Sequence, residues 1–143
     1  GSPLRGALEV APDYRRRLVH YIEDNETNVE VMRGILSQRT QIELAVSLNG
    51  LDGLAAVRLR RPDLILLDMH LPDIDGLELL RHLKHDDAVA DIPVIVVSAD
   101  ATPLRMEEAL TLGAAHYLTK PVDIGALLHL LDSTLSALDT RWG

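Results

Sequence analysis

Acidic, hydroxyl and lysine side chains stand directly after short apolar runs of the sequence. Glu23 and Asp24 follow one run, Asp68 follows another, and Ser98 and Lys120 follow two more. If these runs are parallel strands, their carboxyl ends meet at one edge of a sheet and bring the side chains together. Carboxylates gathered there raise one another's pKa unless a cation offsets their charge, and oxygen ligands without His or Cys select Mg²⁺. A magnesium ion and a lysine beside an attacking carboxylate suit phosphoryl transfer.

The order of apolar runs and helical segments predicts how these side chains are positioned. The two kinds of segment alternate, which is typical of helices packed on a parallel sheet in an α/β fold. Strands are predicted at residues 18–22, 42–47, 64–67, 93–97 and 114–118. Helices are predicted after the cap Asn25 or Thr27, over 51–59 and 77–85, from the cap Thr102 to Gly113, and over 123–138. The aliphatic run 64–67 favours a central strand, and the alternation in 42–47 favours an edge strand.

Two predicted helices carry apolar residues whose direction matters for the fold. In the helix over 51–59 we expect the inward face to consist of Leu51, Leu54, Ala55 and Leu59. The last helix carries an apolar arc wider than contact with a sheet requires. The arc is formed by Leu127, Leu128, Leu130, Leu131, Leu135 and Leu138. Its surplus either extends the core or contacts a partner domain or a second copy in a homodimer, together with the helix that begins near Thr102.

Composition limits the classes of protein that this sequence can encode. With 143 residues, 47% of them apolar, the chain has the size of one compact domain. We place it at residues 17–138, after a flexible lead-in of 1–16 with a tag remnant at Gly1-Ser2, and before a tail of 139–143. The net charge of −8 opposes direct binding to nucleic acid, and the absence of cysteine excludes thiol chemistry. No apolar run has the length of a membrane span, so we expect a soluble, cytoplasmic domain without membrane contact.

Four short motifs, in this order along the chain, resemble the receiver domains of response regulators. They are Glu23-Asp24-Asn25, the segment 68–76 from Asp68 to Gly76, Ser98-Ala99, and Lys120-Pro121. The similarity extends over about residues 17–138. It implies a flavodoxin-like, doubly wound sandwich of three layers, with a five-stranded parallel sheet in the order 2-1-3-4-5. The opening residues resemble the receivers of hybrid sensor histidine kinases more than those fused to DNA-binding domains.

The resemblance also implies which residues accept the phosphoryl group and hold the metal. Asp68 would receive the group from a histidine kinase or a histidine phosphotransfer domain and form an acyl phosphate. Asp24, Asp68 and the backbone carbonyl of Met69 would bind Mg²⁺, and Glu23 would do so largely through water. The domain would not be an enzyme beyond catalysing its own phosphorylation and dephosphorylation.

A further implication of the resemblance is a conformational switch. Ser98 and Lys120 would each bind a phosphoryl oxygen, and the peptide bond before Pro121 would be cis. Tyr117 would turn inward when Ser98 is drawn toward the phosphate, so that the surface around residues 98–121 changes shape.

Other interpretations use the same residues differently. A phosphatase similar to the haloacid dehalogenases also uses an aspartate after an apolar strand, but it usually needs a second aspartate where this sequence has His70. A receiver domain that only binds proteins, without being phosphorylated, would not need the acidic residues and the lysine of the phosphorylation site, all of which are present. His82 and His85 suggest a metal or phosphate relay, although no carboxylate pattern accompanies them and we favour solvated helix residues.

Overall fold

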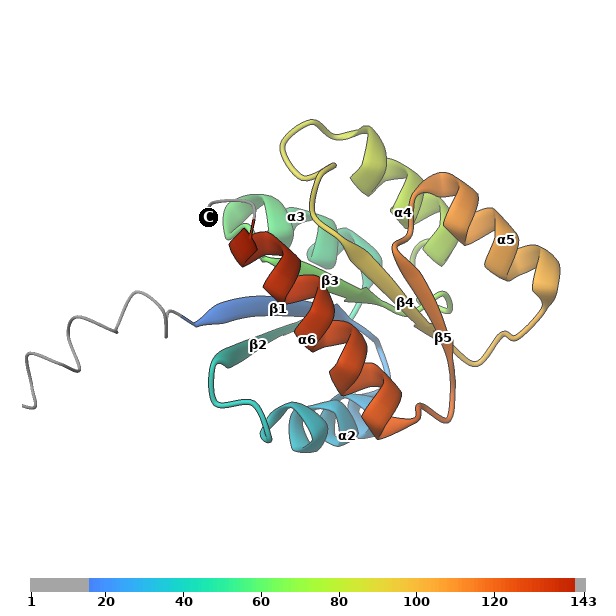
Figure 1. Ribbon diagram of the computed structural model, residues 1–143. Coiled ribbons are helices and arrows are strands. Elements are labelled where there is room, and N and C mark those ends of the chain that lie inside the picture. The colour runs from blue at the N-terminus through green and yellow to red at the C-terminus, as the bar shows by residue number, and fades with distance from the viewer. Residues whose placement is uncertain (1–15, 141–143) are drawn as a thin grey trace, which may run out of the picture.

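The structure is a computed structural model that describes residues 16–140, with side chains to residue 138. The predicted tag remnant at Gly1-Ser2, the lead-in as far as residue 15 and residues 141–143 of the tail lie outside the described residues. The strands are β1 Arg17–Ile22, β2 Ile42–Ser47, β3 Leu64–Leu67, β4 Val94–Ser98 and β5 His116–Thr119. The helices are α2 Glu26–Leu36, α3 Gly50–Leu59, α4 Gly76–His85, α5 Pro103–Leu112 and α6 Ile124–Thr140 (Figure 1).

All five strands form one parallel sheet in the order β2-β1-β3-β4-β5, which confirms the predicted doubly wound topology. Every residue of β3 is fully buried, as expected for a central strand, and β2 lies at an edge. Strand β5 begins at His116, two residues later than predicted. The reason is that the backbone N–H of Ala114 still donates to the Ala109 carbonyl and closes the end of α5.

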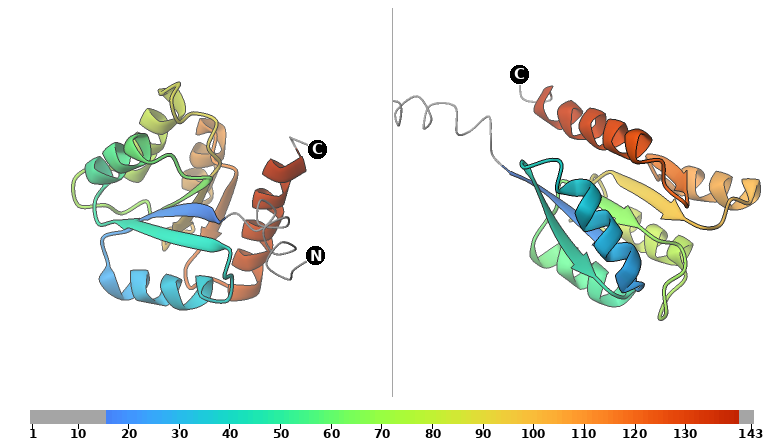
Figure 2. Two further views of the ribbon diagram at one scale, coloured as in Figure 1. Left: turned by 90° about the vertical axis from the view of Figure 1, so that its left-hand side faces the viewer. Right: turned by 90° about the horizontal axis from the view of Figure 1, so that it is seen from below.

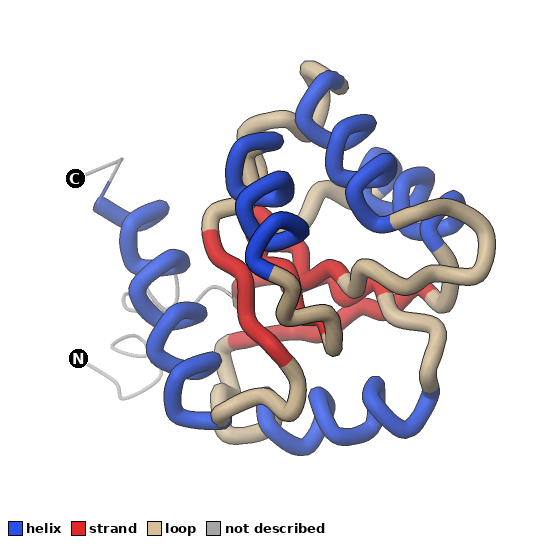
Figure 3. Tube along the Cα trace, turned by 90° about the vertical axis from the view of Figure 1, so that its right-hand side faces the viewer, coloured by secondary structure: helices blue, strands red, loops and turns tan. Residues whose placement is uncertain are grey.

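Two hydrophobic clusters fill the space between the sheet and the helices on either face. One cluster joins α2 and α6 to alternate residues of the sheet, and the other joins α3, α4 and α5 to the residues between them. Figures 1 and 2 show these two helix layers on opposite sides of the strands, and Figure 3 shows the sheet between them. This three-layer arrangement leaves the carboxyl ends of the strands free of helix packing.

The inward face of α3 differs from the prediction. Its buried residues are Gly50, Gly53 and Val57, whereas Leu51 is 56% exposed and Leu59 is 90% exposed. The reason is the close approach of the helix to β1, because a Cβ atom at Gly53 would lie 2.6 Å from Cδ1 of Ile22. The helix therefore packs on the sheet through its glycines and Val57. Of the four residues predicted to face inward, Leu54 does pack against this cluster, whereas Leu51, Ala55 and Leu59 are exposed.

Helix α6 uses most of its wide apolar arc inside the domain. Leu127, Leu128, Leu131 and Leu135 are buried, and Leu130 and Leu138 pack against the same cluster. Ile124 at the start of the helix is 48% exposed. The arc therefore extends the core over the sheet, and a contact with a second copy or a partner domain stays a prediction.

Capping residues fix the helix ends that border the loops after the strands. The side chain of Asn25 accepts from the backbone N–H of Asn28 at the start of α2, as predicted. Thr102 occupies the position before α5, but its side chain makes no capping hydrogen bond. Its own N–H instead donates to the Asp100 carboxylate at 2.9 Å, so Thr102 takes part in the turn before the helix and does not cap α5 through its side chain. Gly113 ends α5 in the left-handed conformation, at φ 115°.

Candidate functional site

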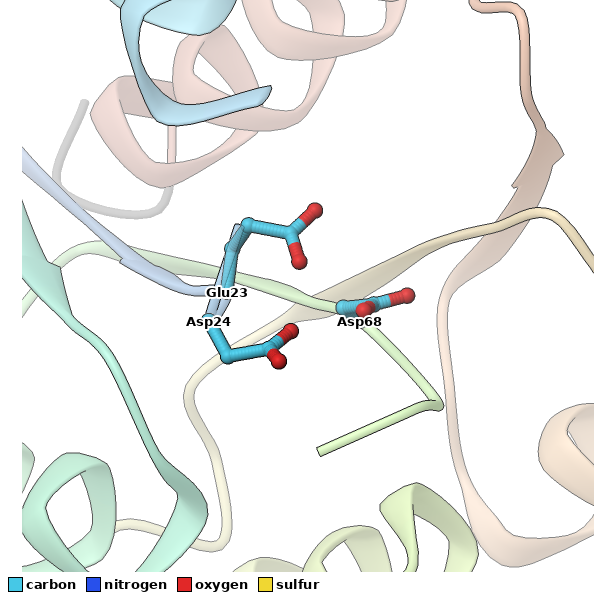
Figure 4. Close-up of side chains that lie close together, drawn as sticks. All are labelled: Glu23, Asp24 and Asp68. Atoms are coloured by element: carbon cyan, nitrogen blue, oxygen red, sulfur yellow. The ribbon is translucent and has the colours of Figure 1, made fainter. Parts of the chain in front are cut away.

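The three carboxylates that follow β1 and β3 meet at the edge of the sheet. Glu23 and Asp24 come directly after β1, and Asp68 comes directly after β3, which pairs with β1. One carboxylate oxygen from each lies within 4.8 Å of the others. Figure 4 shows the three side chains close together where the strands end. Glu23 and Asp68 are buried, and Asp24 is exposed. This is the convergence that the sequence predicts.

Lys120 completes the charge arrangement from the loop after β5. Its Nζ lies 2.6 Å from Oε1 of Glu23 and 3.7 Å from Oδ1 of Asp68. The peptide bond between Lys120 and Pro121 is cis, as the resemblance implies. The lysine therefore bridges two of the three carboxylates, and its single positive charge leaves an excess of negative charge at the site.

Burial and mutual repulsion divide the two buried carboxylates into an easily protonated group and an ionised one. Burial, with a further contribution from the Glu23 carboxylate, raises the pKa of Asp68 to about 6. Burial also acts to raise the pKa of Glu23, but the hydrogen bond and charge of Lys120, together with contributions from Asp68 and the backbone at Asn25, outweigh it and hold that pKa below its usual value. A cation bound between these groups would favour the ionised form of Asp68.

The loop from β3 to α4 holds the backbone carbonyl of Met69 beside the carboxylates. The N–H of Gly76 donates to this carbonyl at 3.0 Å. The Asp73 carboxylate accepts from the N–H groups of Gly50 and Leu51, at 2.8 Å each, and so ties the loop to the start of α3. The loop is thus closed between its two ends and tied to α3 at its middle, which fixes the position of the carbonyl.

Gly76 allows this loop to pass close to α4, which makes its substitution costly. A Cβ atom there would lie 2.4 Å from Cα and 2.8 Å from the carbonyl oxygen of Met69, both backbone atoms. We expect Gly76→Ala to lower the free energy of unfolding by about 2 kcal/mol, because a packed backbone must move. Chemical denaturation measures this. Gly34→Ala in α2 is the control, since a Cβ there meets nothing within 4 Å and is expected not to destabilise the protein. Equal stability of the two variants would contradict the packing argument.

Ser98 and Tyr117 are both joined to the turn after β4. Ser98 is fully buried, and its Oγ accepts from the N–H of Asp100 at 3.0 Å. The hydroxyl of Tyr117, which is half-buried, donates to the carbonyl of Asp100 at 2.6 Å. The backbone N–H of Lys120 donates to the Ser98 carbonyl, which places the ends of β4 and β5 side by side. The two proposed switch residues therefore share one backbone segment.

Several residues at the site were not predicted from the sequence. Tyr21 and Asn28 donate hydrogen bonds to Glu23. Tyr21 could have been found, because a residue two positions before Glu23 on a strand points to the same face. Arg105 on α5 pairs with Asp75 and lies 3.9 Å from Asp100, and this contact depends on how α5 packs against α4. His82 and His85 are exposed residues of α4, in agreement with the interpretation favoured above.

The donor set fits a hard divalent cation. Three carboxylates from two loops offer oxygen atoms at one point, with more negative charge than Lys120 neutralises. A pocket of about 480 Å³, lined by Asp24, Met69 and the loop as far as Asp75, opens beside them. Oxygen ligands at a partly open site are typical of Mg²⁺ sites in proteins. Among the described residues, these three carboxylates are the one group of acidic or histidine side chains that lie close enough together to hold a metal ion.

Comparison with known proteins identifies the family. Residues 19–132 match the model of the response regulator receiver domain, and the chain belongs to this family. It is 37% identical over 117 residues to the polar-differentiation response regulator DivK of Brucella anthropi, covering 82% of this chain and 94% of that protein. A similar solved structure is the receiver domain of sensor histidine kinase PA1611 from Pseudomonas aeruginosa, with a magnesium ion in its active-site cleft. It is 25% identical, with a TM-score of 0.76, and the alignment covers 85% of this chain and 98% of that one.

A second solved structure supports the fold alone. The signal receiver domain of a LuxO repressor protein from Vibrio parahaemolyticus has a TM-score of 0.82 at 21% identity, covering 88% of this chain and 95% of that one.

The family match and the similarity to DivK make this chain a phosphoacceptor domain of a two-component system, which decides against the phosphatase interpretation. No helix within residues 16–140 combines the length and apolar character needed to cross a membrane.

Proposed function

We propose that this receiver domain accepts a phosphoryl group on Asp68, in a Mg²⁺-dependent step, from a histidine kinase or a histidine phosphotransfer domain. The main support for this proposal is the position of Asp68. Its carboxylate is buried, stands within 4.8 Å of the other two carboxylates, and has Lys120 Nζ at 3.7 Å. A carboxylate with an adjoining metal site and a fixed cation is the arrangement that phosphoryl transfer needs.

Each residue has a defined part in the transfer. An Oδ atom of Asp68 attacks phosphorus, a P–O bond forms, and the P–N bond to the donor histidine breaks. Mg²⁺, when bound, neutralises charge on the transferred group, and Asp24, Asp68 and the Met69 carbonyl would hold it, with Glu23 acting largely through water. Lys120 leaves Glu23 to bind a phosphoryl oxygen. In this proposal the domain catalyses its own phosphorylation and dephosphorylation and has no other enzymatic activity.

The switch follows from the contacts of Ser98. When its Oγ turns to a phosphoryl oxygen, it gives up the N–H of Asp100 and draws the turn after β4 toward Asp68. The carbonyl of Asp100 is the acceptor of the Tyr117 hydroxyl, so movement of the turn releases the tyrosine to rotate inward. Phosphorylation favours the second arrangement only by the bonds that it gains there.

We also propose where the domain begins and ends, where it is located and what it contacts. We place its boundaries at residues 17–138, which include the matched residues 19–132, and we propose a cytoplasmic location and no direct contact with nucleic acid. A homodimer or a partner domain would bind through α6 with α5, where Ile124, Leu104 and Leu110 are exposed.

The experiment that tests the proposal is intact-protein mass spectrometry after incubation with acetyl phosphate and Mg²⁺. We expect the mass of one phosphoryl group to be added to the wild-type chain and none to Asp68→Asn, because the amide cannot form an acyl phosphate. No added mass in the wild type would support the interpretation as a protein-binding receiver that is not phosphorylated. A phosphoryl group that persists in Asp68→Asn would place the acceptor elsewhere.

A further inference from the structure

The carboxylate of Glu23 receives more hydrogen bonds than a ligand acting largely through water requires. Its side chain is 1% exposed. Its Oε1 accepts from the hydroxyl of Tyr21 at 3.0 Å, from Nδ2 of Asn28 at 3.0 Å and from Nζ of Lys120 at 2.6 Å. A buried carboxylate is tolerated only with such partners, and three donors on one oxygen fix its direction as well as its charge.

The three donors differ in how firmly the fold holds them. Tyr21 belongs to β1, is 1% exposed and packs in the core between the sheet and the helices α2 and α6. Asn28 lies in the first turn of α2, where its backbone N–H is bound by the cap Asn25. Lys120 comes from a loop, and its side chain is 20% exposed. Tyr21 and Asn28 are therefore the fixed donors, and Lys120 is the one able to move.

We propose that Tyr21 and Asn28 are positioning residues that keep the Glu23 carboxylate directed for the cation, both before phosphorylation and when Lys120 moves to the phosphoryl group. This inference rests on the proposed function. Lys120 Nζ is 2.6 Å from Oε1 of Glu23 and 3.7 Å from Oδ1 of Asp68, so a move toward a phosphoryl group on Asp68 would weaken its bond to Glu23. The two fixed donors then hold Oε1 in place. Oε2, whose contact with the N–H of Asn25 is 3.4 Å, remains available to the cation or its water.

The test is a calorimetric titration of the Tyr21→Phe variant with Mg²⁺ alone, in the absence of a phosphoryl donor. The phenyl ring fills the same space, so only the hydroxyl is lost. We expect the dissociation constant for Mg²⁺ to rise roughly tenfold, as is typical when a partner of a metal ligand is removed. Asn28→Ala, which does not disturb the core, is expected to weaken binding in the same direction.

A second readout separates positioning from damage to the fold. The rate of phosphorylation by acetyl phosphate should fall in Tyr21→Phe at low Mg²⁺ and return to the wild-type rate at saturating Mg²⁺. Ser47→Ala is the matched control, because it also removes a buried hydroxyl, which pairs with Nε2 of His20 at 2.7 Å and not with the Glu23 carboxylate. The Ser47 backbone carbonyl, which accepts from the N–H of Glu23, is retained in this variant, so it should titrate like the wild type.

Three results would overturn the inference. They are wild-type affinity for Mg²⁺ in both Tyr21→Phe and Asn28→Ala, a loss of rate that is equal at all Mg²⁺ concentrations, and weakened binding in Ser47→Ala to the same extent. A wild-type chain that binds no Mg²⁺ or accepts no phosphoryl group would instead overturn the proposed function, and this inference with it.

Discussion

Asp24→Asn is expected to lower the rate of phosphorylation by acetyl phosphate roughly 100-fold at limiting Mg²⁺, which corresponds to about 3 kcal/mol of lost transition-state stabilisation. Asp24 is the exposed member of the carboxylate cluster and, in our proposal, a direct ligand of Mg²⁺. The amide keeps the shape of the side chain but removes its charge, so the cation loses a ligand that balances it. The measurement is a time course of phosphorylation followed by intact mass over a series of Mg²⁺ concentrations.

The control for this experiment is Glu26→Gln. Glu26 is exposed in the first turn of α2, two residues beyond Asp24, and lies outside the carboxylate cluster. The Glu26→Gln substitution removes one negative charge, as Asp24→Asn does, and should leave the rate of phosphorylation unchanged. Addition of a chelator to the wild-type protein should reproduce the loss seen in Asp24→Asn. If Asp24→Asn were phosphorylated as fast as the wild type, Asp24 would not be a ligand of the catalytic metal.

Asp68→Asn is expected to stabilise the metal-free protein at neutral pH by about 2 to 3 kcal/mol. Burial and the neighbouring Glu23 carboxylate raise the pKa of Asp68 to about 6 in the folded state, whereas an unfolded aspartate titrates near 3.8. The folded state therefore binds the proton more tightly. The wild type loses stability as the pH rises from about 4 through about 6, and the neutral asparagine avoids that loss. Urea denaturation of both proteins in the presence of a chelator, from pH 4 to 7.5, measures the difference.

The difference between wild type and Asp68→Asn should vanish near pH 4, where the aspartate is protonated in the folded state. Asp73→Asn provides a control of opposite sign. Although its slight burial acts to raise the pKa, the N–H groups of Leu51 and Gly50 hold the pKa of Asp73 below its usual value. That variant should be less stable than the wild type at neutral pH, with a deficit that shrinks as the pH falls through the folded pKa of Asp73. Destabilisation by Asp68→Asn at pH 7.5 would contradict the electrostatic account of the site.

Features that depend on strand ends were predictable from the sequence. Each apolar run ends at the residue where the structure ends the strand or within one residue of it, so the convergence of Glu23, Asp24 and Asp68 followed from topology alone. The burial of β3 followed as well, because four consecutive aliphatic residues suit a strand covered on both faces.

Features that depend on contact between elements were not predictable in this way. The inward face of α3 was assigned to Leu51, Leu54, Ala55 and Leu59, of which only Leu54 packs inward, because the close approach at Gly53 against Ile22 decides the orientation of the helix. A pattern of apolar residues carries no information on such an approach. Likewise, the pairing of Arg105 with Asp75 joins residues thirty positions apart and requires the packing of α4 on α5.

We propose that an Oδ atom of Asp68 becomes covalently bound to phosphorus. Reduction with borohydride converts an acyl phosphate to an alcohol, so a phosphorylated aspartate becomes homoserine. We predict that the wild-type chain, treated with acetyl phosphate and Mg²⁺ and then reduced, carries homoserine at position 68 in peptide sequencing by mass spectrometry. Homoserine at another acidic residue, or none despite a phosphoryl group in the intact mass, would contradict the assignment of Asp68 as the phosphoacceptor.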